Sequence, residues 1–348
     1  MKRANEVMIR FEGVSIVFGD RPKRALPLMD QGLDRAEIEK RTGQILGVHD
    51  CTLNVREGEI AVLMGLSGSG KSTLLRAVNG LNKVAAGRVL VETGAGLIDV
   101  AKAGAKDLQR LRTERVSMVF QQFALLPWRS VIDNVAFGLE LSGMPAAKRR
   151  ARAMEQLEIV GLEGWAERKV HELSGGMQQR VGLARAFATQ APILLMDEPF
   201  SALDPLIRAK LQDELLVLQR QLKRTILFVS HDLDEAVKLG STIAIMDGGR
   251  IIQAGTPEQI VLDPRTPYVA DFVEHMNPLG VLRAVDVMRP GPGRPTETVA
   301  GSVRRDTPVR DMLALLTRSY PGSLAVIDRG SIVGVVGPDD ILAALVKR

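Results

Sequence analysis

A glycine-rich loop between an apolar run and a helix-forming run constrains the fold of this chain more than any other feature. The apolar run Ile60–Met64 is short enough for a buried strand, and Lys71–Val78 is predicted to form the following helix. The loop between them fits GxxxxGK[ST] and reads Gly65-Leu66-Ser67-Gly68-Ser69-Gly70-Lys71-Ser72. Glycines in such a loop let backbone N–H groups surround phosphate oxygens at a helix N-terminus. The alternative, a surface turn, does not explain the flanking strand and helix.

Two acidic residues follow another apolar run further along the chain. The apolar run Ile193–Met196 ends in Asp197 and Glu198, and parallel strands present ligands at their carboxyl ends. We expect Lys71 to reach the β and γ phosphates of a nucleotide, and Ser72 and Asp197 to hold Mg²⁺. Glu198 is expected to act as the general base that polarises the attacking water. Two acids at a strand end are weak evidence alone, but downstream of a phosphate loop they predict nucleotide hydrolysis.

The remaining chain has the rhythm of a parallel α/β sheet interrupted by helices. Apolar runs alternate with helical segments over Ile193–Met196, Thr225–Val229 and Thr242–Met246. A helical pattern predicts a subdomain over about residues 123–172, including a helix over Ala146–Val160. The predicted fold class is therefore α/β.

Both ends of the chain carry additional segments. A strand is expected over residues 7–18, followed by a charged insertion, 21–44, with a short helix near Asp34–Arg41. After Asn277-Pro278 the character changes to the Pro/Gly-interrupted segment Arg289–Pro295. Two apolar strands follow, Leu324–Ile327 and Ile332–Val336. We therefore expect a first domain over 1–277 and a small second domain over 278–348.

Composition excludes some classes of protein. The single cysteine, Cys51, rules out an internal disulfide framework, and we expect it to be a small buried residue in a reducing compartment. The sequence contains no run approaching the ~20 apolar residues of a membrane span and no signal-peptide pattern at its start. The net charge of +5 fits nucleic acid or an anionic membrane, but the basic residues are scattered as on solvated surfaces. We expect a chain that neither spans a membrane nor is secreted.

Shortly before Asp197, the segment Leu173-Ser174-Gly175-Gly176-Met177-Gln178-Gln179-Arg180 resembles the signature motif of the ABC ATPases. The resemblance covers roughly residues 7–275 and implies an ABC-type P-loop nucleotide-binding domain. It further implies a homodimer, in which each ATP lies between the phosphate loop of one copy and Ser174–Gln178 of the other. Met177 is a departure, since the family usually has glutamine there.

Other motifs of the family match by position. Gln121 resembles the glutamine that senses the γ-phosphate and Mg²⁺, and His231 resembles the switch histidine that contacts the γ-phosphate. Phe18 is the candidate for stacking on adenine, with core packing as the alternative. Thr73 extends the predicted ATP-binding loop. The residues that resemble the loop crossing the dimer are Ser201, Ala202, Leu203 and Asp204.

Several sequence segments resemble those of one branch of the family, the ATP-binding subunits of importers for glycine betaine, proline betaine and choline. They are the 21–44 insertion, Gly65–Ser67, Leu173–Met177 and Ala202–Arg208. This implies an ATPase bound peripherally to the cytoplasmic face of the inner membrane, with ATP and Mg²⁺ as cofactors. The implied partners are integral membrane permease subunits, docking near Phe123–Asp133, and indirectly a periplasmic or extracellular substrate-binding protein, with no nucleic acid.

The C-terminal segment resembles a cystathionine-β-synthase-like (CBS) regulatory module. Thr307-Pro308-Val309 opens a predicted helix, and Gly334 precedes Pro338-Asp339-Asp340. Betaine importers usually carry two such modules in tandem, whereas this segment has room for one. Our hypothesis is that two single modules pair across the subunit dimer.

Three other functions compete with this interpretation. An importer of a different small solute would share every motif above. A soluble ABC ATPase acting on nucleic acid would typically add a second cassette, a long coiled coil or a zinc hook, and the sequence shows none of these. A P-loop kinase would leave the segment Leu173–Arg180 unexplained.

Overall fold

The computed structural model describes residues 6–274, 278–291, 299–318 and 322–346. The chain divides by its internal contacts into two compact units, Met1–Ala254 and Gly255–Arg348. This division precedes residue 277, where the sequence suggested a domain boundary, and leaves two short helices with the second unit. The domain limits proposed from the sequence stay a prediction.

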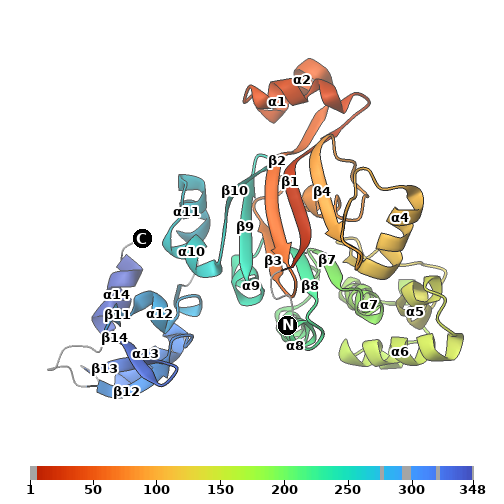
Figure 1. Cartoon of the computed structure of the whole chain (residues 1–348). Helices are drawn as coiled ribbons and strands as arrows, with labels where there is room; N and C mark the ends of the chain where they lie inside the picture. The colour runs from red at the N-terminus through yellow and green to blue at the C-terminus, as the bar shows by residue number, and fades with distance from the viewer. Residues whose placement is uncertain (1–5, 275–277, 292–298, 319–321, 347–348) are drawn as a thin grey trace. The chain divides into compact units, whose positions relative to one another are not determined.

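The first unit contains two sheets (Figure 1). An antiparallel sheet of order β2-β1-β4-β5 consists of β1 (Val7–Phe18), β2 (Ile45–Arg56), β4 (Ala86–Glu92) and β5 (Leu97–Asp99). The second sheet has the order β10-β9-β3-β8-β7-β6, with β3 (Ile60–Met64), β6 (Val116–Val119), β7 (Ile193–Asp197), β8 (Thr225–Val229), β9 (Thr242–Asp247) and β10 (Arg250–Gly255). From β9 to β6 its strands pair in parallel, as the alternation of apolar runs and helices predicted.

Buried apolar side chains explain why these strands form the centre of the unit. Every residue of β3, β7 and β8 is buried, as expected for strands covered on both faces. Their side chains join those of the antiparallel sheet in one core, which includes Phe11, Leu63 and Leu195. Cys51 lies in the same core, where burial raises the pKa of its thiol to about 11.

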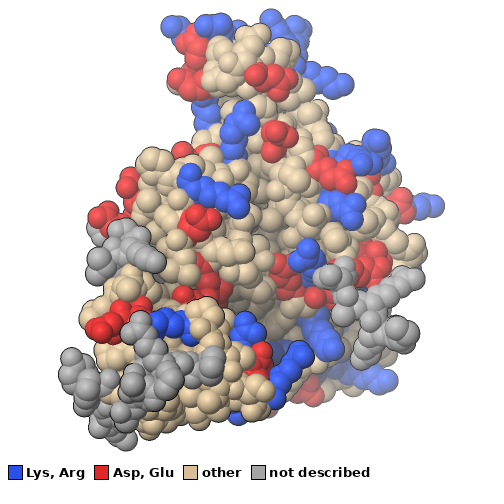
Figure 2. All heavy atoms as spheres, turned by 60° about the vertical axis from the view of Figure 1, so that its left-hand side comes forward, with Lys and Arg blue, Asp and Glu red and all other residues tan. Residues whose placement is uncertain are grey.

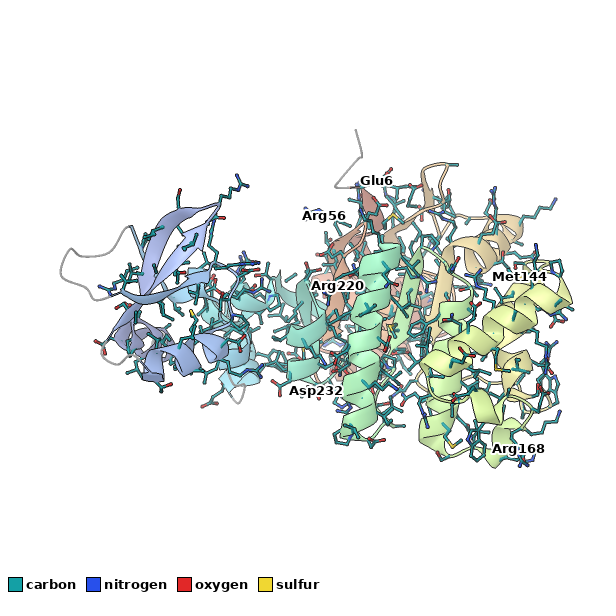
Figure 3. All side chains as sticks on the ribbon, turned by 90° about the horizontal axis from the view of Figure 1, so that it is seen from below. Glu6, Arg56, Met144, Arg168, Arg220 and Asp232 are labelled. Carbon is teal, nitrogen blue, oxygen red and sulfur yellow. The ribbon has the colours of Figure 1, made fainter. Side chains whose placement is uncertain are left out.

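Helices connect and flank these strands. Those of the first unit are α1 (Leu26–Asp30), α2 (Arg35–Thr42), α3 (Lys71–Leu75), α4 (Ala105–Arg110), α5 (Val131–Leu141), α6 (Ala146–Ile159), α7 (Gly175–Ala188), α8 (Pro205–Leu222) and α9 (Leu233–Leu239). Shorter turns are η1 (Pro22–Arg24), η2 (Leu111–Arg115), η3 (Glu163–Trp165) and η4 (Val170–Glu172). The predicted helical subdomain corresponds to α5 and α6 with the turns after them. Both helices pack on α7. Met144 and Arg168 mark this region in Figure 3.

The helix after the phosphate loop is shorter than predicted. It was expected over Lys71–Val78, but α3 ends at Leu75. The chain tightens there, because the N–H groups of Ala77 and Val78 donate to carbonyls three residues earlier rather than four.

The N-terminal insertion is an ordered element. Asp34 caps α2 by accepting a hydrogen bond from the Glu37 N–H at 2.8 Å, close to where a helix was predicted. Met29 and Ile38 are fully buried in a small cluster with Val17 and Leu46 of the first two strands. Figure 1 shows α1 and α2 beyond the ends of β1 and β2.

The second unit has its own core. Its sheet has the order β11-β14-β13-β12, built from β11 (Arg289–Pro290), β12 (Val299–Arg304), β13 (Ser323–Asp328) and β14 (Ser331–Val336). Its helices are α10 (Pro257–Leu262), α11 (Pro267–Glu274), η5 (Pro278–Gly280), α12 (Ala284–Val287), α13 (Val309–Arg318) and α14 (Pro338–Val346). Both predicted strands and the helix opened by Thr307-Pro308-Val309 are present, whereas most of the segment 289–295 lies outside the described residues.

Charged side chains of both signs share the surface of the molecule. In Figure 2, acidic and basic side chains are interspersed over the visible face, as the scattered basic residues predicted. Among the helices of the described residues, none is both long and apolar enough to cross a membrane.

Candidate functional site

The loop between β3 and α3 has a backbone that only glycine adopts readily. Gly65, Gly68 and Gly70 have φ values of +141°, +79° and +101°. A Cβ atom on Gly65 would lie 2.1 Å from the Met246 carbonyl oxygen. The glycines thus allow the loop to pass close to β9. Leu66, Ser67 and Gly68 are exposed at its tip, whereas Ser69 is buried.

Lys71 occupies the interior of this loop. Its ammonium group donates to the carbonyl oxygens of Gly65 at 2.8 Å and Leu66 at 2.9 Å. Burial lowers the pKa of Lys71, and the nearby carboxylates of Glu198 and Asp197 oppose this shift. A cation enclosed by a ring of backbone groups is suited to bind phosphate oxygens.

Asp197 ends β7 directly beside the loop. Its fully buried carboxylate accepts a hydrogen bond from the Ser72 hydroxyl at 2.6 Å and an ion-paired one from Arg76 at 2.8 Å. Ser72 and Asp197 are therefore brought together as the sequence predicted. Arg76 was not predicted, although its position one turn after Ser72 on the same helical segment places it on the same side.

A hydroxyl and a carboxylate in contact are ligands that Mg²⁺ accepts when water and phosphate oxygens complete its shell. Among the described residues, no group of three or more His, Cys, Asp or Glu side chains gathers that could hold a metal ion. The chemistry of Ser72 and Asp197 fits a cation that arrives with a nucleotide.

Glu198 is the centre of a second cluster. Its φ of +48° is left-handed, and its N–H donates to the Val229 carbonyl oxygen of β8 at 3.2 Å. Gln121 Nε2 donates to the Glu198 carboxylate at 3.1 Å, and His231 Nδ1 lies 3.6 Å from the same oxygen. Three residues predicted separately thus meet at one carboxylate, at the carboxyl ends of β6, β7 and β8.

The segment that resembles a signature motif begins α7. Ser174 is its N-cap and accepts from the Met177 N–H at 3.4 Å. Ser174 and Gly175 are exposed, while Gly176 and Met177 are half-buried. Gln178 anchors this turn by donating to the carbonyls of Val170 and Leu173. This arrangement presents the N-terminal turn of a 14-residue helix to solvent.

Gln179 connects this helix to the loop that follows β7, a contact that the sequence analysis missed. Its side chain is buried, donates to the Glu198 carbonyl oxygen at 3.2 Å and accepts from the Ala202 N–H at 3.0 Å. Ser201 also donates to the Glu198 carbonyl oxygen, at 3.1 Å. The only signal was its place within the motif.

The rest of the predicted dimer-crossing loop leads into α8. Asp204 caps α8 by accepting from the N–H groups of Leu206 and Ile207, and Leu203 is buried. The buried Gln179 side chain therefore links the first turns of α7 to Glu198 and to the loop Ser201–Asp204.

Phe18 ends β1 near the phosphate loop. The residue is 41% exposed and lines a pocket of about 320 Å³ with Pro22 and Leu81. Gly47 lies between Phe18 and Thr73, since a Cβ atom there would be 2.9 Å from both side chains. The exposed ring speaks against simple core packing and leaves a face for an aromatic ligand.

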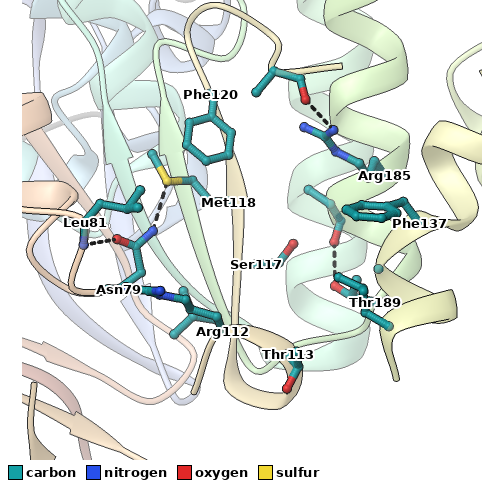
Figure 4. Close-up of a pocket in the computed structure, with 15 residues that line it drawn as sticks. Asn79, Leu81, Arg112, Thr113, Ser117, Met118, Phe120, Phe137, Arg185 and Thr189 are labelled. Carbon is teal, nitrogen blue, oxygen red and sulfur yellow. Dashed lines mark hydrogen bonds between the residues drawn. The ribbon is translucent and has the colours of Figure 1, made fainter. Parts of the chain in front are cut away.

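A groove lies between the edge of the six-stranded sheet and the helical subdomain (Figure 4). Its volume is about 320 Å³. One wall includes Asn79 and Phe120, and the other includes Phe137, Arg185 and Thr189. Arg185 donates to the carbonyls of Phe123 and Ala124, both of which have positive φ. The groove therefore adjoins the segment that follows Gln121.

Comparison with known proteins places these features in a family. The ABC transporter profile matches residues 48–201, and the CBS domain profile matches residues 284–347. The glycine betaine/proline betaine transport system ATP-binding protein ProV of Salmonella typhimurium is 46% identical over 94% of this chain and 80% of its own length. The chain belongs to the ABC transporter family.

Other relatives and a solved structure agree with this membership. The trimethylamine N-oxide transport system ATP-binding protein TmoW of Ruegeria pomeroyi is 42% identical, and the match covers 100% of this chain and 99% of that protein. The dimeric ATP-binding cassette MJ0796 bound to ADP and phosphate matches 72% of this chain and 99% of its own, with a TM-score of 0.62 and 30% identity. This ABC protein is an ATPase subunit with an ATP-binding cassette and a CBS domain.

Proposed function

We propose that this ABC ATPase energises the uptake of a quaternary ammonium solute, choline or a betaine, through partner permease subunits. The observation that carries the proposal is the similarity to ProV, which extends over nearly the whole chain rather than over the cassette alone. It therefore includes the N-terminal insertion and the CBS unit. The ATPase would bind peripherally at the cytoplasmic face of the membrane, and a substrate-binding protein would meet the permease on the other side.

Hydrolysis would use the two clusters around the ends of β7. Lys71 and the loop N–H groups would hold the phosphates, and Ser72, Asp197 and Gln121 would hold Mg²⁺, which neutralises phosphate charge when bound. Glu198 would take a proton from the attacking water, and His231 would contact the γ-phosphate. The convergence of Gln121 and His231 on the Glu198 carboxylate supports these assignments.

The signature residues would act on the nucleotide of a second copy. Ser174–Gln178 form the N-cap and first turn of α7, and this exposed helix N-terminus is suited to a γ-phosphate. The loop Ser201–Asp204 would cross the same homodimer interface, while Phe18 would stack on adenine. The MJ0796 cassette, described as dimeric and bound to ADP and phosphate, supports this arrangement.

The groove beside Gln121 is the proposed docking site for a permease helix. Phe120, Ala124 and Leu141 contribute to its apolar lining, and the exposed Trp128 lies in the adjoining segment. A helix inserted there would contact the same segment that carries Gln121 to the catalytic carboxylate. Transport and hydrolysis would be coupled at this point.

Trimethylamine N-oxide is the second candidate solute. The match to TmoW covers 100% of this chain and 99% of TmoW, whereas the match to ProV covers only 80% of ProV. Both solutes carry a methylated nitrogen, and both belong to the permease and binding protein rather than to this subunit.

Uptake in a strain that lacks this subunit decides between the candidates. The wild-type gene should restore uptake of labelled glycine betaine, proline betaine or choline, and a Lys71→Ala gene should not. Restored uptake of trimethylamine N-oxide alone would select the second candidate. Purification with nucleic acid instead of a permease, and no restored uptake, would contradict both.

A further inference from the structure

Arg35, in the N-terminal insertion, reaches the phosphate loop. It is the first residue of α2, directly after the capping Asp34. Its Nη1 donates to the Gly68 carbonyl oxygen at 2.5 Å, and its Nη2 donates to the Gly47 carbonyl oxygen at 2.7 Å. Gly68 belongs to the phosphate loop and Gly47 to β2. One guanidinium therefore joins the loop to the sheet.

Holding the Gly68 carbonyl also orients an N–H group of the loop. A trans peptide group is planar, so the Ser69 N–H points opposite to the Gly68 carbonyl. Gly68 and Gly70 both have left-handed φ and few steric limits on rotation of the peptides beside them. The Ser69 N–H donates to the Leu66 carbonyl oxygen within the loop at 3.2 Å, and Arg35 holds the carbonyl side of the same peptide group from outside the loop.

The insertion gives Arg35 a firm base. Met29 and Ile38 are buried in the cluster with Val17 and Leu46, and the Gln44 side chain accepts from the Arg21 N–H at 2.9 Å. Burial lowers the pKa of Arg35, and Asp247 opposes this shift. An arginine guanidinium stays charged in proteins at neutral pH. A fork of two charged donors is geometrically more restrictive than a single ammonium group.

We propose that Arg35 is a positioning residue that braces the phosphate loop in its nucleotide-binding conformation, so that the insertion sets the affinity for ATP. The brace acts through the Gly68 and Gly47 carbonyl groups and not on the reacting atoms. It serves the bound state and the transition state equally, which changes KM and leaves kcat nearly constant. The proposal requires nucleotide binding by this loop but no particular transported solute.

The test uses the full chain and two measurements. Calorimetric titration with ATP without Mg²⁺ gives affinity, and steady-state hydrolysis of Mg-ATP gives kcat and KM. Arg35→Ala should weaken ATP binding and raise KM by about tenfold, as expected for the loss of charge-assisted hydrogen bonds, with kcat within about twofold. Arg35→Lys should give an intermediate affinity, because its single ammonium group cannot copy the fork.

Arg41→Ala is the matched control on the same helix. Arg41 pairs with Glu37, and its side chain is 54% exposed, so its loss should leave ATP affinity and KM unchanged. Unchanged ATP affinity in Arg35→Ala overturns the proposal. Full recovery in Arg35→Lys also overturns it, because charge alone would then suffice; this variant decides the matter if Arg35→Ala unfolds. Failure of solute uptake would not alter these measurements.

Discussion

At the scale of single residues, the Glu198 carboxylate is held by its backbone and by its neighbours. A left-handed φ in a non-glycine residue is costly, and here it turns the side chain toward Gln121 and His231. The N–H of Glu198 is bonded to β8 and its carbonyl to Gln179 and Ser201. Strain and hydrogen bonds therefore fix the carboxylate at the strand ends.

Glu198→Gln is expected to separate ATP binding from hydrolysis. The amide keeps the shape of the carboxyl group but cannot accept the proton of the attacking water. Turnover should fall by about 10²- to 10⁴-fold, whereas ATP binding persists and a nucleotide-bound dimer accumulates. Phosphate-release kinetics and size-exclusion chromatography with ATP measure both effects. A variant that hydrolyses ATP at a near wild-type rate shows that the base lies elsewhere.

Glu235 predicts a dependence of stability on pH. Burial raises the pKa of Glu235, and the nearby charge of Asp232 raises it further. Hydrogen bonds from Ser230 and Gln212 and the charge of Arg208 lower it by less. The native state thus keeps this proton to a higher pH than the unfolded chain does. The contribution of Glu235 to stability is full below the ordinary carboxyl pKa and is lost as the pH rises through the raised value.

Glu235→Gln should therefore gain thermal stability relative to the wild type as the pH rises. The gain in Tm should be about 2 to 4 °C for each ~1 kcal/mol of unfolding free energy that the wild type loses when Glu235 ionises. Melting curves from about pH 4 to pH 8 measure it. Glu155→Gln, on the exposed surface of α6, should show no such trend. A constant difference in Tm between Glu235→Gln and the wild type would contradict the argument.

At the scale of elements, the phosphate loop depends on how closely it passes its neighbours. Gly65 and Gly68 both have positive φ, but only Gly65 faces a nearby atom, the Met246 carbonyl at the end of β9. Substitution of Gly68 therefore tests the energetic cost of the backbone conformation alone, whereas substitution of Gly65 adds the cost of a steric clash with β9.

Gly68→Ala should cost about 1 to 2 kcal/mol in unfolding free energy, from backbone conformation alone. Gly65→Ala should cost about 3 kcal/mol or more, since β9 must also move. Chemical denaturation of the nucleotide-free protein compares them directly. Equal stability of the two variants would mean that the loop can retreat from β9.

At the scale of the whole molecule, the chain combines two compact units with separate cores. The segment that matches the CBS domain contains an ion pair between exposed side chains, Arg305 with Asp328 at 3.0 Å, and a second pair between the exposed Arg289 and the half-buried Asp340 at 2.9 Å. Ion pairs of this kind weaken as salt increases. They offer a physical basis for a response to ionic strength.

Deletion of residues 279–348 should leave ATP hydrolysis in place and make its rate less sensitive to salt than that of the full chain. The cassette keeps the clusters around Asp197 and Glu198, while the ion pairs of the C-terminal segment are removed. ATPase rates over a range of salt concentrations, with and without the permease, measure the effect. An identical salt response in the truncated and full chains would remove the regulatory role of this unit.

Local pattern was enough to predict much of the fold and many of the site residues. Apolar runs identified β3, β7 and β8 because fully buried strands need continuous apolar sequence, and glycine spacing identified the phosphate loop. The same local signals misjudged the end of α3, where hydrogen bonding changes from one turn to the next without a breaking residue.

Only tertiary structure decided which of these residues meet. Ser72 and Asp197 lie 125 positions apart in sequence and touch because β3 and β7 each pair with β8 in one parallel sheet. Arg35 reaches the site from a segment whose sequence carries no sign of that contact, and Gln179 was marked only by its place within the motif. A hydrogen bond to a backbone carbonyl places no demand on the identity of the residue that carries the carbonyl. Sequence by itself determined the elements and the chemistry of the loop, whereas the order of the strands determined the site.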